Sequence, residues 1–241
     1  LEKSVIKNAD GLFAVSRDLI RILKNKAPNI DPKKFLEIPN GYDPNDFSSM
    51  KKKIKNESYT IVYTGTLTLD YPIQLLYKSL RKIIEKPNNH ITLKIAGRPA
   101  KECIDYLSEM DKQFGNFEFI YSGYLSHKKS VQLLESADCL LLLIPNIKEN
   151  KGILTGKIFE YIGSGKVIWG FGPEKGDAQE ILTDCNAGSI FEDYESATDT
   201  LQKYINEDTT GANLENREKY TRAELAKMIL SRIIKDSEKK G

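Results

Sequence analysis

The run Thr60-Ile-Val-Tyr-Thr-Gly65 decides the fold, because it opens the part of the chain in which strand and helix patterns alternate. Its β-branched and aromatic residues predict a strand over 60–64. Apolar residues then recur with helical spacing from Ile73 to Ile84, and a second strand pattern follows at Ile91–Ile95. A strand, a helix and a strand in this order form a βαβ unit, whose two strands lie parallel in one sheet.

The same alternation runs through the whole chain. Further strands are expected at 12–15, 35–38, 117–121, 139–144, 167–169 and 189–191. Further helices are expected at 16–26, 100–114, 127–136, 156–163, 176–183, 194–206 and 221–237. We therefore predict an α/β fold with a Rossmann-like parallel sheet and helices on both faces, in which ligands bind at the carboxyl ends of the strands.

Composition narrows the possible functions. The chain has 241 residues, with 36 Lys and Arg against 34 Asp and Glu, so a net charge of +2 gives no reason to expect a nucleic-acid partner. The three cysteines stand far apart, which predicts no metal site and suits a reducing compartment such as the cytoplasm. The longest aliphatic run, Leu140–Ile144, is too short to span a bilayer. The chain opens with Leu1 rather than Met, which suggests that an upstream segment is missing.

The segment 152–162 carries the most informative motif. It is similar to a nucleotide-binding P-loop but lacks the first glycine and the final Ser or Thr, so an ATPase of that class is disfavoured. Thr155, Gly156 and Lys157 nevertheless begin a helix, where free N–H groups and a lysine attract phosphate. Glu160 lies ~6 Å further along the helix axis, about one step from phosphate to ribose. The alternative is an ordinary surface ion pair between Lys157 and Glu160 or a neighbour, which the pattern alone favours.

Three other strand ends offer candidate ligand groups. Gly65 would let a phosphate approach the backbone closely, and Arg98 could contact a phosphate. The segment Ser122–Leu125, which contains Tyr124 and Leu125, could present backbone groups to the edge of a base. Taken alone, each position is explained as well or better by an ordinary turn between strand and helix. His127 has no neighbouring nucleophile motif, so we assign it no catalytic role.

Taken together, these residues resemble the C-terminal half of a GT-B-fold glycosyltransferase of the retaining family 4 type. The resemblance covers nearly the whole chain and rests on seven motifs in the family's order. They are Asp10-Gly-Leu-Phe-Ala-Val-Ser16, Ile38-Pro-Asn-Gly-Tyr-Asp43, Val62-Tyr-Thr-Gly65, Ile95-Ala-Gly97, Tyr121-Ser-Gly123, Ala137-Asp138-Cys-Leu-Leu and Gly156-Lys-Ile-Phe-Glu-Tyr-Ile-Gly-Ser-Gly-Lys166.

The resemblance implies a domain that binds a nucleoside-diphosphate sugar. Residues 1–43 would be a remnant of an N-terminal acceptor domain with the interdomain connection, 44–211 the nucleotide-sugar-binding domain, and 212–241 a helical extension. The last helix would return toward the missing domain, which predicts exposed apolar surface. The complete enzyme would transfer the sugar with retention to a glycan or lipid-linked acceptor, as in polysaccharide biosynthesis at the inner face of a membrane. This chain alone would be inactive, and neither a metal nor another cofactor is implied.

The site residues follow from the same resemblance by position. The donor-binding set is Gly65, Thr66, Arg98, Tyr124, Leu125, Thr155, Gly156, Lys157 and Glu160. Glu160 matches the family's ribose-binding glutamate, and the backbone from Thr155 to Lys157 matches its diphosphate site. The catalytic residues would lie in the missing domain.

Three departures from the family pattern leave other functions open. The family often has Glu, Arg and Lys at the positions of Gly152, Thr66 and Tyr71, so the usual positive charges on the leaving diphosphate are absent. Lys157, Arg98 or Lys151 could compensate. The alternatives are a non-catalytic nucleotide-sugar-binding module, a sugar-nucleotide 2-epimerase, which shares the fold, and a plain interaction domain. The base, the sugar and the acceptor are not encoded in any pattern we identify.

Overall fold

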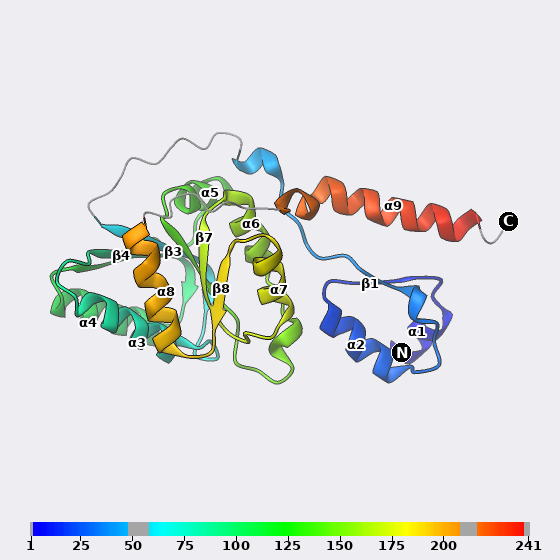
Figure 1. The fold of residues 1–241 in the computed structure, drawn as a ribbon, viewed down its shortest axis with the longest axis horizontal. Helices are drawn as coiled ribbons and strands as arrows, with labels where there is room; N and C mark the ends of the chain where they lie inside the picture. Colours follow the sequence, from blue (N-terminus) through cyan, green and yellow to red (C-terminus); the bar gives the residue numbers. More distant parts are fainter. Residues whose placement is uncertain (1, 48–57, 208–215, 239–241) are drawn as a thin grey trace.

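A parallel sheet of six strands forms the core of the larger part of the molecule, at the left in Figure 1. The computed structural model describes residues 2–47, 58–207 and 216–238. The strands are β3 (Tyr59–Leu67), β4 (Ile91–Pro99), β5 (Phe117–Tyr121), β6 (Cys139–Leu143), β7 (Val167–Phe171) and β8 (Gly188–Phe191). Their order is β5-β4-β3-β6-β7-β8, so the strand order reverses between β3 and β6. In open α/β sheets, the carboxyl ends of the strands at such a reversal form a ligand-binding crevice.

Helices cover both faces of this sheet, which confirms the predicted fold class (Figure 1). On one face lie α3 (Ile73–Ile84), α4 (Lys101–Gln113) and α8 (Tyr194–Glu207). On the other lie α5 (His127–Glu135), α6 (Gly156–Ser164) and α7 (Asp177–Asp184). Trp169 of β7 is fully buried in the first of the two cores, and its indole N–H donates a 2.9 Å hydrogen bond to the carbonyl of Ala197. The apolar residues that the periodicity places inward therefore supply both cores.

A small N-terminal unit lies apart from the sheet, beneath α9 in Figure 1. It comprises α1 (Glu2–Asn8), β1 (Leu12–Ala14), α2 (Arg17–Lys26) and β2 (Phe35–Glu37), and its two strands pair in parallel. Ser16 begins α2 as predicted, because its hydroxyl accepts a hydrogen bond from the N–H of Leu19 at 3.2 Å. The helix at 2–8 has no counterpart in the sequence prediction. It buries only Ile6, so its sequence lacks an extended apolar face.

The two chain segments that link this unit to the sheet run side by side. Tyr42 forms a parallel bridge with Thr221. The N–H of Tyr42 donates to the carbonyl of Tyr220 at 3.1 Å, and the N–H of Arg222 donates to the carbonyl of Tyr42 at 3.0 Å. The Tyr42 ring also packs on Gly163 near the end of α6, where an added Cβ would lie 2.5 Å from it. Residues 41–42 and 220–222 therefore form one connected crossing against α6.

The last helix, α9 (Arg222–Glu238), extends from this crossing over the N-terminal unit (Figure 1). The Arg232 guanidinium donates to the carbonyl of Lys33 at 2.5 Å. Leu230, Ile233 and Ile234 stay 52–57% exposed, which confirms the expected apolar surface. The predicted boundary at 211–212 lies outside the described residues. The division into domains 1–43, 44–211 and 212–241 remains a prediction.

Two strands run further than the sequence predicts, and this changes the setting of three candidate residues. Gly65 and Thr66 lie within β3, and Arg98 lies within β4, rather than in loops after the strands. The ladder continues because Gly65 and Gly97 face each other in register, with φ of 120° and 125°. Only glycine adopts such backbone angles readily. The two glycines therefore let the strands stay paired beyond the residues at which the side-chain pattern predicts them to end.

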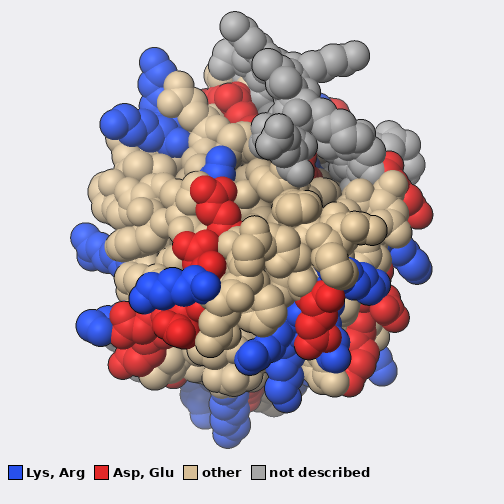
Figure 2. Space-filling model, turned by 90° about the vertical axis from the view of Figure 1, so that its left-hand side faces the viewer, with Lys and Arg blue, Asp and Glu red and all other residues tan. Residues whose placement is uncertain are grey.

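On the face shown in Figure 2, which is the side of α4 in Figure 1, basic and acidic side chains are interspersed. Within the described ranges, no helix is long and apolar enough to cross a bilayer.

Candidate donor-binding site

At the crevice beside the strand-order reversal, backbone segments at the ends of neighbouring strands approach one another unusually closely. An added Cβ on Gly97 would lie 2.2 Å from the carbonyl oxygen of Gly65. The N–H of Gly97 in turn donates a 2.8 Å hydrogen bond to the carbonyl of Gly123. The glycines thus bring the ends of β3, β4 and β5 together, which leaves space above them for a ligand.

A cavity of about 220 Å³ lies in this crevice. Its lining residues are Thr64, Gly65, Ala96, Gly97, Tyr124, Leu125, Ser130, Lys157 and Glu160. Five of the nine predicted donor-binding residues are among them. The other four, Thr66, Arg98, Thr155 and Gly156, are not.

Lys157 is the cation of this cavity, and its side chain is largely buried. Its Nζ lies 2.8 Å from the hydroxyl of Tyr63 and 4.3 Å from the centre of the Tyr63 ring. Within the described part of the chain, Lys157 forms no ion pair with a carboxylate. The alternative prediction of an ion pair between Lys157 and Glu160 is therefore wrong. Burial lowers the pKa of Lys157 to about 8, while the charge of Glu160 acts in the opposite direction.

Glu160 follows Lys157 one turn later in α6 and lines the same cavity. Burial raises the pKa of its carboxyl, and the nearby charge of His127 lowers it in part. His127 begins α5, and its Nε2 lies 3.1 Å from a carboxylate oxygen of Asp46. No sequence pattern that we identify connects His127 and Asp46 with Glu160, because both stand in polar segments without a chemical motif.

The N-terminus of α6 lies open beside the cavity. No side chain caps its first turn, and the Thr155 hydroxyl oxygen is buried without a hydrogen-bond partner in the described residues. An added Cβ on Gly156 would meet no atom within 4 Å. Unsatisfied N–H groups with open space before them attract an anion.

Arg98 and Tyr124 lie together near the same strand ends. The Arg98 guanidinium lies 5.9 Å from the centre of the Tyr124 ring, within cation–π distance. Tyr124 is 80% exposed and Arg98 is exposed as well. An exposed aromatic ring beside a cavity provides a stacking surface for a planar base.

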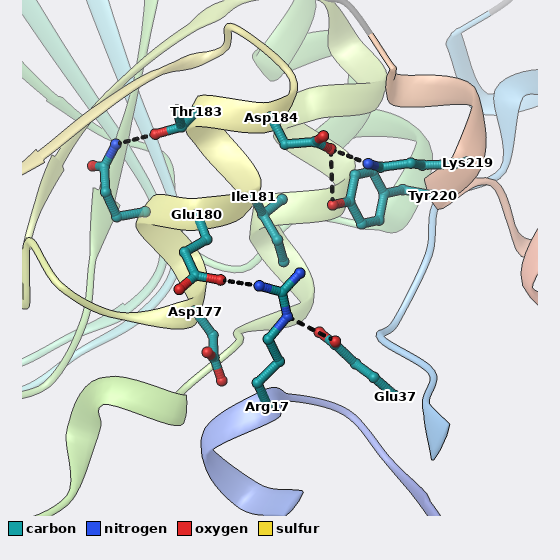
Figure 3. Close-up of a pocket in the computed structure, with 10 residues that line it drawn as sticks. Arg17, Glu37, Asp177, Glu180, Ile181, Thr183, Asp184, Lys219 and Tyr220 are labelled. Carbon is teal, nitrogen blue, oxygen red and sulfur yellow. Dashed lines mark hydrogen bonds and ion pairs between the residues drawn. The ribbon is translucent and has the colours of Figure 1, made fainter. Parts of the chain in front are cut away.

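A second hollow, of about 440 Å³, separates the N-terminal unit from α7 (Figure 3). Arg17 spans it, with guanidinium nitrogens 3.1 Å from Glu37 and 2.6 Å from Glu180. At its far end, Asp184 accepts a hydrogen bond from the hydroxyl of Tyr220 and pairs with Lys219. The remaining charged residue of the hollow, Asp177, accepts a 2.9 Å hydrogen bond from the N–H of Asp18. Each charged side chain of this hollow therefore already has a partner, and we assign the hollow no ligand.

Gly152 faces the N-terminal unit rather than the cavity. An added Cβ there would lie 2.8 Å from the Cβ of Asp18 and 3.0 Å from the hydroxyl of Ser16. The 3-10 helix η3 (Asn150–Gly152) therefore packs directly on the start of α2. A side chain at position 152 would require α2 to move.

Comparison with known proteins agrees with this architecture. No protein-family model matches the chain. An uncharacterized glycosyltransferase of Methanocaldococcus jannaschii is 23% identical over 155 residues, which are 64% of this chain and 37% of the relative. The solved structure of a glycosyltransferase from Rickettsia africae matches with a TM-score of 0.71 at 14% identity. The match covers 98% of this chain and 66% of that protein's chain.

The fold is that of the GT-B glycosyltransferases.

Two further solved structures share this GT-B fold and were determined with nucleotide. The pneumococcal O-GlcNAc transferase in complex with UDP and GlcNAc has a TM-score of 0.70 at 12% identity, with 98% of this chain and 46% of that chain covered. The Anabaena protein HepE in complex with UDP has a TM-score of 0.67 at 13% identity, with 96% and 65% covered. This chain therefore spans about a third of the curated relative and less than two thirds of the structures compared. At such identities the structures establish the GT-B fold alone.

Proposed function

We propose that this chain is the donor-binding part of a glycosyltransferase, which transfers a sugar with retention from a nucleoside-diphosphate sugar to a glycan or lipid-linked acceptor. The observation that carries the proposal is the placement of Lys157 and Glu160 in successive turns of α6, both lining the cavity beside Gly65. A cation and a carboxylate at that spacing suit a diphosphate followed by a ribose.

Each part of the donor has a candidate partner. The diphosphate would lie against Lys157 and the open N-terminus of α6, with Gly65 allowing close approach. Glu160 would accept hydrogen bonds from the ribose hydroxyls. The base would extend toward Tyr124 and Leu125, and Arg98 would hold the Tyr124 ring rather than the phosphates. Thr66 would act only through its backbone.

In the reaction, negative charge grows on the departing diphosphate as the bond to the sugar breaks. A fixed cation and aligned N–H groups stabilise such charge more in the transition state than in the ground state. Lys157 and the start of α6 would supply this stabilisation. The groups that act on the sugar and the acceptor would come from a further domain, so we expect this chain alone to bind the donor without transferring sugar. We place the complete enzyme in the cytoplasm, at the inner face of a membrane.

One observation favours a second candidate, a module that binds nucleotide sugars without catalysis. The positions of Gly152, Thr66 and Tyr71 lack the charged residues that the family often has there. The two functions differ in the complete protein, where only the enzyme would release nucleoside diphosphate from the donor in the presence of acceptor.

The test of donor binding is calorimetric titration of the chain with UDP, GDP and ADP. UDP is titrated first, because it is the nucleotide in the complexes of the two structural neighbours. We expect Glu160→Ala to weaken the binding of the preferred nucleotide by about 1–3 kcal/mol, because a carboxylate that accepts hydrogen bonds is lost. Glu109→Ala, an exposed glutamate toward the end of α4, is the matched control and should change nothing. Equal affinities for all three proteins would contradict the assignment of Glu160, and no binding to any nucleotide would contradict the proposed function.

A further inference from the structure

Three lysine or arginine side chains could supply the positive charge that Thr66 and Tyr71 do not. Arg98 contacts the Tyr124 ring near the strand ends and does not line the cavity. Lys151 is exposed in η3 and does not line the cavity either. Lys157 alone among the three reaches the cavity, and its position depends on neighbours that the sequence motif does not include.

The neighbour that fixes Lys157 is Tyr63, which lies in β3 across from the first turn of α6. The ammonium lies 2.8 Å from the Tyr63 hydroxyl and also over the ring, 4.3 Å from its centre. The ring of Tyr71 lies further away, with its centre 6.0 Å from the ammonium. A flexible lysine side chain is thereby held in one direction by a hydrogen bond and a cation–π contact together.

The Tyr63 hydroxyl is oriented so that it accepts from Lys157. Its own hydrogen is donated to the carbonyl of Thr66 at 2.5 Å, which leaves an oxygen lone pair for the ammonium. Burial raises the pKa of the Tyr63 phenol above its ordinary value, so the hydroxyl stays neutral. A neutral acceptor orients the ammonium without cancelling its charge, and the charge remains available to a ligand.

Gly65 completes the arrangement because it leaves the path of the lysine side chain clear. An added Cβ on Gly65 would lie 2.8 Å from Cε and 3.0 Å from Nζ of Lys157. The tip of the side chain therefore lies directly over the glycine that opens the cavity floor.

We infer that Tyr63 is a positioning residue that holds the Lys157 ammonium over Gly65, and that the ammonium held in this way is the diphosphate-binding cation of the site. The inference rests on the proposed function, which already assigns the charge to Lys157 of α6, and goes beyond it because it assigns the orientation of that charge to a tyrosine of β3. The titratable groups that face Lys157 are Tyr63, Tyr71 and Glu160.

The test is a double-mutant cycle on the 241-residue chain. The variants are Tyr63→Phe, Lys157→Met and the two combined, and Tyr71→Phe is the control that removes a neighbouring phenol hydroxyl. The calorimetric probes are the nucleoside diphosphate that binds most tightly and inorganic pyrophosphate, which has no base or ribose. We expect Lys157→Met to weaken both probes at least about tenfold, and Tyr63→Phe to weaken them about fivefold or more. Tyr71→Phe should leave both affinities unchanged.

The decisive result is the combined variant. If Tyr63 acts only by positioning Lys157, removing its hydroxyl in the Lys157→Met background has no further effect on either probe. A merely structural role of Tyr63 would weaken binding by the same factor in both backgrounds, and that additivity would overturn the inference while leaving the proposed function intact. Binding of neither probe by the unmodified chain would overturn the proposed function and the role of the pair together.

Discussion

Replacing Lys157 by methionine should stabilise the ligand-free chain at neutral pH, although it removes a hydrogen bond. The reason is that the ammonium is buried beside Tyr63 without a carboxylate partner among the described residues. Burial lowers the pKa of Lys157 from 10.5 to about 8, so at pH 7 the protein holds a charge in an environment that disfavours it. Methionine has a similar length, is apolar and fills the same space.

The size of the effect follows from the two pKa values. A fall from 10.5 to about 8 corresponds to roughly 3 kcal/mol of lost stability, because each pH unit is worth about 1.4 kcal/mol. The hydrogen bond to Tyr63 offsets about 1 kcal/mol of this. We therefore expect Lys157→Met to raise the free energy of unfolding by about 2 kcal/mol at pH 7.

The pH dependence gives the sharper test. Between pH 8 and 10.5 the unfolded chain binds more protons at Lys157 than the folded chain does, so the unmodified protein gains stability as pH rises through this window. The advantage of the variant should be complete below pH 8 and fall to zero at about pH 9.5–10. By pH 10.5 the variant should be the less stable protein by up to about 1 kcal/mol, because the neutral amine keeps its hydrogen bond to Tyr63. Urea unfolding of both proteins from pH 7 to pH 10.5 measures the difference. Lys203→Met, an exposed lysine of α8, is the control and should show no such trend.

Two outcomes would refute this reasoning. A variant that is less stable than the unmodified protein at pH 7 would mean that the ammonium stabilises the free fold. A difference that does not change with pH would mean that Lys157 titrates normally.

Three substitutions test the packing of the site and of the N-terminal unit. Gly97→Ala should cost about 3 kcal/mol or more, because its Cβ would meet the backbone of Gly65 and its φ of 125° disfavours any other residue; chemical denaturation measures this. Gly152→Ala should cost about 1–3 kcal/mol and expose α2 to proteolysis, since the new Cβ would collide with Asp18; unchanged proteolysis would contradict direct packing of η3 on α2. Arg17→Ala should change stability by less than about 1 kcal/mol, because its two ion pairs are exposed to solvent, and the change should shrink further in 1 M salt.

The sequence predicted the fold well because the sheet obeys simple periodicity. Runs such as Leu140–Ile144 are apolar throughout, as parallel strands covered on both faces must be. The prediction ended β3 at residue 64, because Gly65 looks like a turn; the ladder continues only through backbone angles that a pattern of side chains does not encode. The helix at 2–8 was missed because a single buried residue gives no helical pattern.

The residues of the site were predicted in outline, but the contact that orients the Lys157 side chain was not. Glycine-rich strand ends and the start of α6 identified five residues that line the cavity. Tyr63 was not among the predicted site residues, because an aromatic residue within a buried strand is typical of a core position. Its role depends on the polar tip of the side chain, which reaches Lys157 across 94 positions of sequence. Long-range contacts of this kind are not visible in local spacing.

The paired crossing at Tyr42 and Thr221 limits how the two parts of the molecule can move. Two separate links at distant points would allow sliding, twisting or shear, whereas adjacent links joined by hydrogen bonds favour rotation about one axis through both. That axis passes against Gly163 near the C-terminal end of α6, the helix that carries Lys157 in its first turn and Glu160 at its middle. If α6 binds the donor as proposed, a turn of the N-terminal unit about this axis would be transmitted to that helix, and donor binding would bias the same rotation.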